Sequence, residues 1–539
     1  MNTRIRLVGA IVSLAFVAVA CGGGGGGNAS GPGASGATGQ RGGSYSIYNY
    51  EPQHLIPQNE YAVEGSQVFD VLWTRLINYD PKTNQPIPDQ AKSVTSTDNT
   101  VWTIEINPGW TFHNGEPVTA QSYVDAWNWG AYGPNGAILN FFFAKIDGYD
   151  ALNPSKGKPT TKELSGLKVV NDTTFQVTLT APFSQFPVEL GFDAFDPLPK
   201  AFFDDPDKFD SHPIGDGPYK LEEWKHDESI TLSRYDNYSG TPGYADKITM
   251  PLYPAGSSAD WADFQAGNID IDGVGSSNLR EAQQSYPDSL QEFPSSILLY
   301  LGLPLNQPAF QNNLVRQALS LALNREAVMN AVLPAETPAD AFSPPVIPGY
   351  RSGSCTYCTY DPEKAKQLLA QAGGWQGGTM TISLYSGDST LEQAMEAIGN
   401  QWKQNLGIDF KLNAMNYNSY YDTYINHKMT GPWWDGWSMD YPSLEDYLRP
   451  SYGSEGSYNA CGYHNTQFDD LIKQGDQAGS FGDSLKFYQQ AQDILDQDMP
   501  NIPWGFIPNR YVHSANVTNV HTQTPFDYVD LADVRVVQQ

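Results

Sequence analysis

Basic residues are scarce in this chain of 539 residues. Lysine and arginine together number 31, against 60 aspartate and glutamate residues, which gives a formal net charge of −29 at pH 7. A polyanionic surface is repelled by phosphate backbones and anionic lipid headgroups, so neither nucleic acid nor an anionic lipid surface is an expected partner. A cationic ligand is favoured, although acidity of this kind also serves solubility.

Long apolar runs are lacking beyond the first twenty residues. Arg4 and Arg6 precede the apolar run of residues 7–20, which is too short to span a bilayer comfortably and fits a signal peptide over residues 1–20. Small residues precede Cys21, although the leucine usual three places before such a cysteine is Ala18. We therefore predict a lipoprotein acylated at Cys21, with plain secretion and an unmodified cysteine as the alternative.

Residues 21–43 lack the large apolar side chains from which a core could be built. They are nearly all Gly, Ser, Ala, Asn, Thr and Pro, which predicts a flexible tether between the lipid anchor and a folded body. Roughly 495 residues remain after it, enough for two or three domains. The expected location is the extracytoplasmic face of the cell membrane.

Only four cysteines are present. Because disulfides persist outside the cytoplasm, we predict a Cys355–Cys358 disulfide. An alternative is a zinc site in which Cys461 and His464 join this pair, since the four residues have the ligand types of a Cys3His centre. The two halves are about a hundred residues apart, so their spacing does not bring them together. We expect no metal and no other cofactor, and the partner of Cys461 stays open.

Familiar catalytic motifs are absent as well. The chain has no G-x-S-x-G elbow, no H-E-x-x-H helix, no G-x-x-x-x-G-K loop and no G-x-G-x-x-G turn. We predict that the protein is not an enzyme. A secreted glycoside hydrolase remains as the alternative of a different class, because such enzymes need only two carboxylates that no motif pairs.

The first half of the chain is dominated by short alternating strands. Apolar residues alternate with polar ones over residues 102–106 and again over 175–179, as expected of half-buried strands. Residues 119–129 are predicted to form a helix that follows the Asn114–Gly115 turn.

The second half has the pattern of an α/β region. Asp361 and Pro362 are predicted to begin a helix that ends before Gly373. A strand near 380–384, a helix near 391–402 and a strand near 408–412 then form a β-α-β unit, whose strands should be parallel.

Short segments spread from about residue 45 to 535 carry a common pattern. They include WTFHNGEPVTA at 110–120, IGDGPY at 214–219, FQAGNID at 264–270, YDPEKA at 360–365 and GWSMDY at 436–441. In this order they resemble the family 5 extracellular solute-binding proteins of oligopeptide and dipeptide importers. Most of these residues are expected to serve turns and the core rather than the ligand.

The resemblance implies an α/β, periplasmic-binding-protein-like fold with two lobes (class II, cluster C) and an extra inserted domain. Lobe I would combine residues 44–72, 196–290 and 505–539, the inserted domain would be 73–195, and lobe II would be 291–504. A monomer of this kind captures a small ligand between its lobes by hinge closure, and the permease subunits of an ABC importer recognise the closed form.

The resemblance also implies ligand-binding residues. In peptide-binding relatives the aspartate of the G-W-x-x-D-Y segment accepts hydrogen bonds from the α-ammonium group of the ligand, and Asp440 occupies that place. The alternative is a structural aspartate that caps a turn. Of the three tryptophans before it, Trp433, Trp434 and Trp437, at least one is expected to line the cleft rather than the core. Glu64 is a further candidate from lobe I.

One departure from the family pattern concerns carboxylate recognition. Positions where oligopeptide binders often carry arginines or a histidine hold Ile425, Trp434 and Leu391 here, and only His427 and Lys428 are basic nearby. Recognition of a ligand carboxylate in the known way is therefore not expected. An oligopeptide is the first choice of ligand, and an oligosaccharide, a metal chelate or another non-peptide solute is the alternative.

Overall fold

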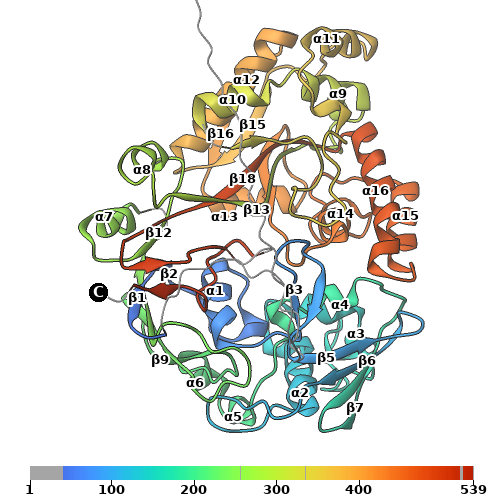
Figure 1. Cartoon of the computed structure of the whole chain (residues 1–539). Helices are drawn as coiled ribbons and strands as arrows, with labels where there is room; N and C mark the ends of the chain where they lie inside the picture. Colours follow the sequence, from blue (N-terminus) through green and yellow to red (C-terminus); the bar gives the residue numbers. More distant parts are fainter. Residues whose placement is uncertain (1–40, 255–256, 334–335, 523–525, 538–539) are drawn as a thin grey trace, which may run out of the picture. The chain divides into compact units, whose positions relative to one another are not determined.

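The computed structural model describes residues 41–254, 257–333, 336–522 and 526–537. The predicted signal peptide, Cys21 and nearly all of the predicted tether lie outside these residues. Within the described ranges, no helix combines the length and the apolar character needed to cross a membrane. The elements are labelled in Figure 1.

A five-stranded sheet joins the start of the folded body to residues two hundred positions later. Its order is β1 (Ser44–Ser46), β11 (Lys247–Tyr253), β10 (Ser229–Arg234) and β9 (Tyr219–Lys225), with β2 (Asn49–Tyr50) also paired to β11. β1 and β2 run parallel to β11, whereas β9, β10 and β11 are antiparallel. Helix α1 (Val63–Leu72) follows β2 in the chain.

A four-stranded antiparallel sheet contains both strands predicted in the first half. Its order is β5 (Ala91–Thr95), β6 (Val101–Ile106), β8 (Thr174–Thr178) and β7 (Leu167–Asn171). The predicted helix is confirmed as α2 (Ala120–Ala131), and the Ser122 hydroxyl accepts from the Thr119 backbone N–H at 3.2 Å to cap it. Trp127 on α2 is fully buried, so the helix contributes to the core beside this sheet.

A seven-stranded mixed sheet carries the second half. Its order is β12 (Ile271–Gly273), β18 (Asn501–His513), β13 (Gln291–Gly302), β17 (Trp433–Trp437), β15 (Met380–Tyr385) and β16 (Phe410–Met415), with β14 (Thr337–Pro338) on β18. Figure 1 shows β13 and β18 side by side, as their antiparallel register requires. The predicted β-α-β unit is confirmed, since β15 and β16 are parallel and α12 (Ser389–Leu406) connects them.

The remaining elements surround these sheets. Asp361 caps α11 (Pro362–Gln371) by accepting from the Lys364 N–H, as predicted. The other helices are α3 (Tyr149–Leu152), α4 (Phe186–Glu189), α5 (Lys200–Asp204), α6 (Pro206–Ser211), α7 (Ala259–Ala266), α8 (Leu279–Ser285), α9 (Asn313–Leu321), α10 (Arg325–Val332), α13 (Tyr417–Ile425), α14 (Leu444–Tyr452), α15 (Thr466–Asp476) and α16 (Phe481–Asp498). Two small sheets pair β3 (Ile77–Tyr79) with β4 (Pro86–Pro88) and β19 (Val517–Thr518) with β20 (Arg535–Val536).

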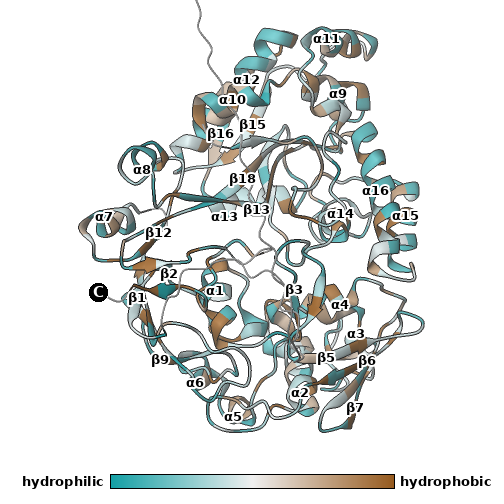
Figure 2. Cartoon of the chain, viewed as in Figure 1, coloured by the Kyte–Doolittle hydropathy of each residue, from teal (hydrophilic) through white to brown (hydrophobic). Residues whose placement is uncertain are grey.

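The apolar core is divided into two large clusters. One contains residues between 45 and 271 together with residues 511–534 and Tyr441, and the other contains residues between 298 and 506. Hydrophobic and hydrophilic residues share single helices such as α15 and α16 in Figure 2, as expected of helices with one buried face.

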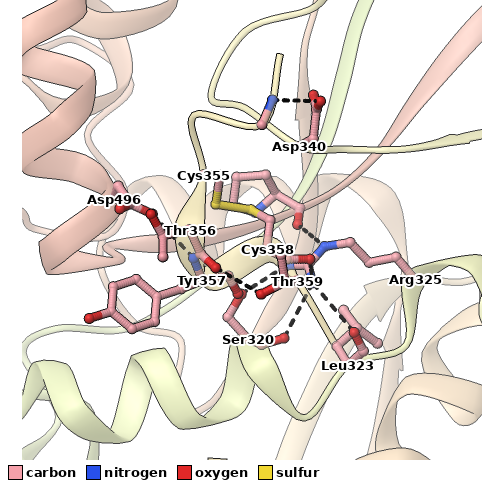
Figure 3. The surroundings of a disulfide bond; sticks show 12 residues. Ser320, Leu323, Arg325, Asp340, Cys355, Thr356, Tyr357, Cys358, Thr359 and Asp496 are labelled. Atoms are coloured by element: carbon pink, nitrogen blue, oxygen red, sulfur yellow. Dashed lines mark hydrogen bonds between the residues drawn. A yellow bond between two sulfur atoms is a disulfide. The ribbon is translucent and has the colours of Figure 1, made fainter. Parts of the chain in front are cut away.

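The structure contains a Cys355–Cys358 disulfide (Figure 3). Beside it the buried Arg325 guanidinium donates to the carbonyl oxygens of Cys358 and Pro503, each at 2.7 Å. Burial lowers the pKa of Arg325 to about 9. Because the disulfide uses both sulfurs, the zinc alternative loses two of its four ligands.

Cys461 belongs to a different apolar cluster, with Tyr420, Met429, Trp433 and Ala460. It forms no disulfide within the described ranges, and burial raises the pKa of its thiol to about 12. A thiol in this state is a small core residue rather than a reactive group.

Candidate functional site

A cavity of about 290 Å³ lies where several distant segments meet. We call it the Asp440 cavity. Its lining comes from residues just before and within the first turns of α1, from residues 192–193, from β13, from residues 435–440 and from residues 526–528. A water takes roughly 30 Å³, so the space corresponds to about ten waters and suits a small ligand. The lining residues include members of both predicted lobes.

Strand β17 distributes its side chains between two cavities. Because successive side chains point to opposite faces of a strand, Trp433, Asp435 and Trp437 share one face and Trp434 lies on the other. Asp435 and Trp437 accordingly line the Asp440 cavity. Trp434 lines a separate cavity of about 370 Å³ with Tyr385 and Leu391, which we call the Trp434 cavity.

Trp433 is a core residue, although it shares the face of Asp435. Its side chain is 1% exposed and stacks against Tyr424 with ring centroids 6.4 Å apart. Of the three tryptophans considered from the sequence, the structure therefore places Trp437 at the Asp440 cavity, Trp434 at the Trp434 cavity and Trp433 in the interior.

Asp440 is a buried carboxyl without a cationic partner. It is 8% exposed, and its Oδ1 accepts one hydrogen bond, from the Tyr61 hydroxyl at 3.2 Å. Burial raises its pKa to about 7, and the Glu189 charge adds to this, whereas the hydrogen bond from Tyr61 and the Lys145 charge oppose it. No backbone N–H among the described residues donates to this carboxylate, as a turn-capping aspartate would require. The carboxylate therefore retains free capacity to accept hydrogen bonds inside the cavity.

Asp446 holds the segment that carries Asp440. Its Oδ2 accepts from the Trp437 indole Nε1–H and from the Asp440 backbone N–H, each at 3.1 Å. Asp446 is 1% exposed and lies in the first turn of α14, which Ser443 caps. Burial raises its pKa, and the neighbouring Asp440 carboxylate raises it further. The start of α14 thus holds in place both the Trp437 ring and the backbone of Asp440 in the cavity wall.

Asp435 is a second carboxyl of the same wall. It accepts from the Gly436 backbone N–H at 2.9 Å, from the Trp433 indole N–H at 3.3 Å and from the Tyr300 hydroxyl. Burial raises its pKa to about 7. The sequence analysis did not identify this residue, although strand alternation places it on the face of Trp437 and was sufficient to find it.

Two further aspartates of the lining are already compensated. The Asp193 carboxylate pairs with the Arg75 guanidinium at 2.9 Å. The Asp527 carboxylate receives hydrogen bonds from the Ser296 backbone N–H at 3.0 Å, the Ser296 hydroxyl at 2.6 Å and the Asn509 side-chain amide at 2.9 Å. Among the described residues that line the Asp440 cavity there is no lysine, arginine or histidine, and neither Asp435 nor Asp440 forms an ion pair within the described residues.

Other residues named from the sequence lie away from this cavity. Val63 and Ser66 line it, whereas Glu64 between them does not, so a contact from Glu64 requires a ligand that extends beyond the cavity. His427 Nδ1 lies 3.0 Å from the Ala460 carbonyl oxygen, and Lys428 forms an exposed pair with Asp422. Neither basic group reaches the lining.

The chain is similar to known solute-binding proteins. The sequence model described as bacterial extracellular solute-binding proteins, family 5 (middle), matches residues 85–459. The dipeptide-binding protein DppE of Bacillus subtilis is 28% identical over 472 residues, which is 84% of each chain. The oligopeptide-binding protein OppA of the same organism is 27% identical over 543 residues, covering 96% of this chain and 97% of that protein.

Solved structures support the predicted two-lobe α/β fold. The ABC transporter substrate binding protein CtaP of Listeria monocytogenes has a TM-score of 0.79 at 22% identity, covering 93% of this chain and 100% of that one. The family match extends over most of the chain, from the hairpin of β3 and β4 to the residues that follow α14. This chain belongs to the bacterial extracellular solute-binding proteins of family 5.

Proposed function

We propose that this protein is the extracellular binding component of an ABC importer and that it captures a small peptide in the Asp440 cavity. The observation that carries the proposal is the buried Asp440 carboxyl, which faces a cavity and has no cationic partner within the described ranges. The names of the two Bacillus relatives, a dipeptide-binding and an oligopeptide-binding protein, support a peptide ligand. The name of the Listeria neighbour supports the transport role.

The chemistry of capture follows from the environment of Asp440. An α-ammonium group brings both a positive charge and N–H donors, and a carboxylate that is largely buried gains more from that charge than it would in open water. Asp446 keeps the Asp440 backbone and the Trp437 ring in place, so little ordering remains to be done when the ligand arrives. A neutral ligand of the same shape would leave the Asp440 carboxylate buried and uncompensated.

Closure of two lobes would couple capture to transport. Tyr61 belongs to the predicted lobe I and Asp440 to the predicted lobe II, so a ligand bound beside their hydrogen bond touches both. Such a ligand favours the closed arrangement because only that arrangement supplies all of its contacts. The domain ranges predicted from the sequence, 44–72 with 196–290 and 505–539, 73–195, and 291–504, form part of this proposal, as does a monomeric state.

The anchor is proposed from the sequence, with support from the extracellular character of the family. Residues 1–20 would be removed, Cys21 would carry acyl chains, and residues 21–43 would tether the body to the extracytoplasmic face of the membrane. Replacing Cys21 by serine should move the protein from the membrane fraction to the soluble extracellular fraction. Retention in the membrane would contradict the anchor.

The protein is proposed to bind without catalysis. Its relatives carry the names of binding proteins, and hinge closure needs no covalent step. Incubation with a panel of polysaccharides should release no reducing sugar. Sustained release would favour the glycoside hydrolase alternative.

A matched pair of peptides tests the function. Ala-Ala-Ala should raise the thermal transition of the purified protein in a concentration-dependent way, by about 2.7 kcal/mol of stabilisation at a hundredfold excess over Kd. N-acetyl-Ala-Ala-Ala, which lacks the α-ammonium group, should give a much smaller shift. Native mass spectrometry of gently purified protein should show a bound amine. Equal shifts with the two peptides would contradict the role of Asp440.

A further inference from the structure

Asp435 has hydrogen-bonding capacity that the protein does not use. A carboxylate can accept about four hydrogen bonds. Asp435 receives one of ordinary length from the Gly436 N–H, a long one from the Trp433 indole N–H and one from the Tyr300 hydroxyl, which itself lines the cavity. No lysine, arginine or histidine among the described residues forms an ion pair with it. Its side chain lines the Asp440 cavity on the same strand face as Trp437, so the unused capacity faces the ligand space.

The charges around the cavity are of one sign. Asp193 is neutralised by Arg75, whereas neither Asp435 nor Asp440 forms an ion pair with a lysine, arginine or histidine among the described residues. Two carboxyls without an ion-pair partner on the wall of one cavity make ionisation of both costly. A ligand with a single cation compensates one of them and leaves the other, whereas a ligand with two cations compensates both.

Aromatic rings add a second preference for positive charge. The lining contains the rings of Tyr61, Tyr300, Tyr424, Trp437, Tyr458 and Phe526. Ring faces attract ammonium and guanidinium groups. The carboxylates add a requirement for N–H donors, because Asp440 accepts only one hydrogen bond from the protein. Primary ammonium or guanidinium groups meet both conditions, and a quaternary ammonium group meets only the first.

The separation of the two carboxyls limits the ligand. Residues two apart on a strand lie about 7 Å from one another, and Asp440 follows Trp437 by three further residues beyond the end of β17. The two acidic side chains therefore flank Trp437 in sequence rather than sharing one point. Two cations joined by a flexible chain match this arrangement, as in a peptide that begins with lysine or arginine, or in a linear diamine.

We propose that the site selects a ligand with two cationic nitrogen groups, one held by Asp440 and the other by Asp435. This inference rests on the proposed binding site, and it adds Asp435 as the residue that determines specificity. A free carboxylate of the ligand finds no cation in the cavity, so it would have to extend outward or be absent. A peptide with a basic first residue and a linear diamine share the required chemistry.

Isothermal titration calorimetry with three probes tests this inference. Lys-Ala-Ala and norleucine-Ala-Ala have first side chains of nearly equal length and differ in the second positive charge, and 1,5-diaminopentane carries both charges without a carboxylate. The wild-type protein should bind Lys-Ala-Ala about tenfold more tightly than the norleucine peptide, the scale of one charged hydrogen bond. Asp435→Asn should reduce this ratio to below about threefold and leave the norleucine peptide nearly unaffected. Asp440→Asn, the matched control, should weaken both peptides by a similar factor.

The outcomes separate the selectivity from the peptide function. Equal affinity of the wild type for the two peptides, or a preference that survives Asp435→Asn, would overturn the selectivity and leave peptide capture standing. Binding of 1,5-diaminopentane that depends on Asp435, without binding of either peptide, would overturn peptide capture and support the selectivity. Binding of none of the three would overturn both. The wild-type comparison needs no variant, so misfolding of Asp435→Asn cannot conceal the answer.

Discussion

Two neighbouring cavities share Trp437, Asp440 and Tyr458 but differ in how the acidic residues of their walls are paired with cations. In the second, of about 230 Å³ and called here the Lys145 cavity, Lys145 pairs with Glu189 at 2.6 Å. Arg449 there pairs with both Glu445 and Asp476. On the wall of the Asp440 cavity, by contrast, Asp435 and Asp440 form no ion pair within the described residues, although the Lys145 charge acts on Asp440 from the second cavity.

The difference separates charges that serve folding from charges that serve a ligand. Glu445 is completely surrounded by protein, yet the attraction of Arg449 and Lys145 holds its pKa below the usual range despite its burial. Asp435 and Asp440 form no ion pair among the described residues, and burial raises the pKa of each to about 7. A carboxyl that the fold itself has not neutralised is available to be neutralised by something that binds.

Arg449→Met should give the largest loss of stability. It leaves the buried Glu445 and the largely buried Asp476 without their shared cation, which costs about 3–5 kcal/mol of the free energy of unfolding. Urea denaturation measures the loss. The control is Lys366→Met, which removes an exposed pair with Glu363 and should cost less than about 1 kcal/mol. Similar losses of unfolding free energy in the two variants would show that the ion pairs of Arg449 contribute no more to folding than an exposed pair does.

Asp440→Asn should show the opposite profile, with a loss of binding and an intact fold. Removal of the charge should weaken binding of Ala-Ala-Ala by about 1.5–3 kcal/mol, which corresponds to roughly 10- to 150-fold. The free energy of unfolding at pH 7 should not fall, since the variant removes a buried carboxyl whose ionisation the fold disfavours. Calorimetry and urea denaturation on the same preparation decide the point. A fall in stability as large as the fall in affinity would assign Asp440 a structural role.

Binding should depend on pH in a direction set by the raised pKa values. The folded protein retains protons on Asp435 and Asp440 that the unfolded chain releases, so these groups lower the stability of the ligand-free protein as pH rises from about 4 to about 7. A cation binds the ionised carboxylates. Affinity should therefore rise about tenfold per pH unit for each carboxyl that must ionise, and then level off above about pH 7.

Calorimetry at pH 6 in two buffers of different ionisation enthalpy measures the protons released on binding. Asp440→Asn should reduce the number released. Affinity that is flat from pH 5 to pH 7 would show that neither carboxyl takes part.

The smallest effect is expected on the other face of β17. Trp434→Leu changes the Trp434 cavity and should alter the affinity for Ala-Ala-Ala by less than about twofold, because the ring does not line the Asp440 cavity. Trp437→Leu, the partner variant, should cost about 1 kcal/mol of binding free energy, or about fivefold. Competition binding with a fluorescent peptide compares the two. If Trp434→Leu weakened binding more than Trp437→Leu, the ligand would occupy the Trp434 cavity and not the Asp440 cavity.

Sequence reasoning succeeded where the signal is local. The alternation over residues 102–106, the Asp361–Pro362 start of α11 and the β-α-β pattern around α12 each depend on neighbouring residues, and all three were confirmed. The predicted α2 ends two residues beyond its expected end at Trp129, since the apolar face continues to Ala131.

The hydrogen-bond partners within the site could not be predicted from local sequence patterns. Tyr61 and Asp440 are 379 positions apart, so no pattern joins them. Asp446 accepts hydrogen bonds from Trp437 and from the Asp440 backbone. These bonds depend on where α14 begins relative to the end of β17, which only the tertiary structure determines. Asp435 was within reach, because its place on the face of Trp437 follows from strand periodicity alone.

A crystal structure of the protein with Lys-Ala-Ala tests the central claim most directly. The account predicts the peptide inside the Asp440 cavity, with its α-ammonium nitrogen about 2.8 Å from the Asp440 carboxylate, the usual length of a charge-assisted hydrogen bond. A peptide bound elsewhere on the protein, or one whose amino group points to solvent while Asp440 keeps only Tyr61, would contradict it.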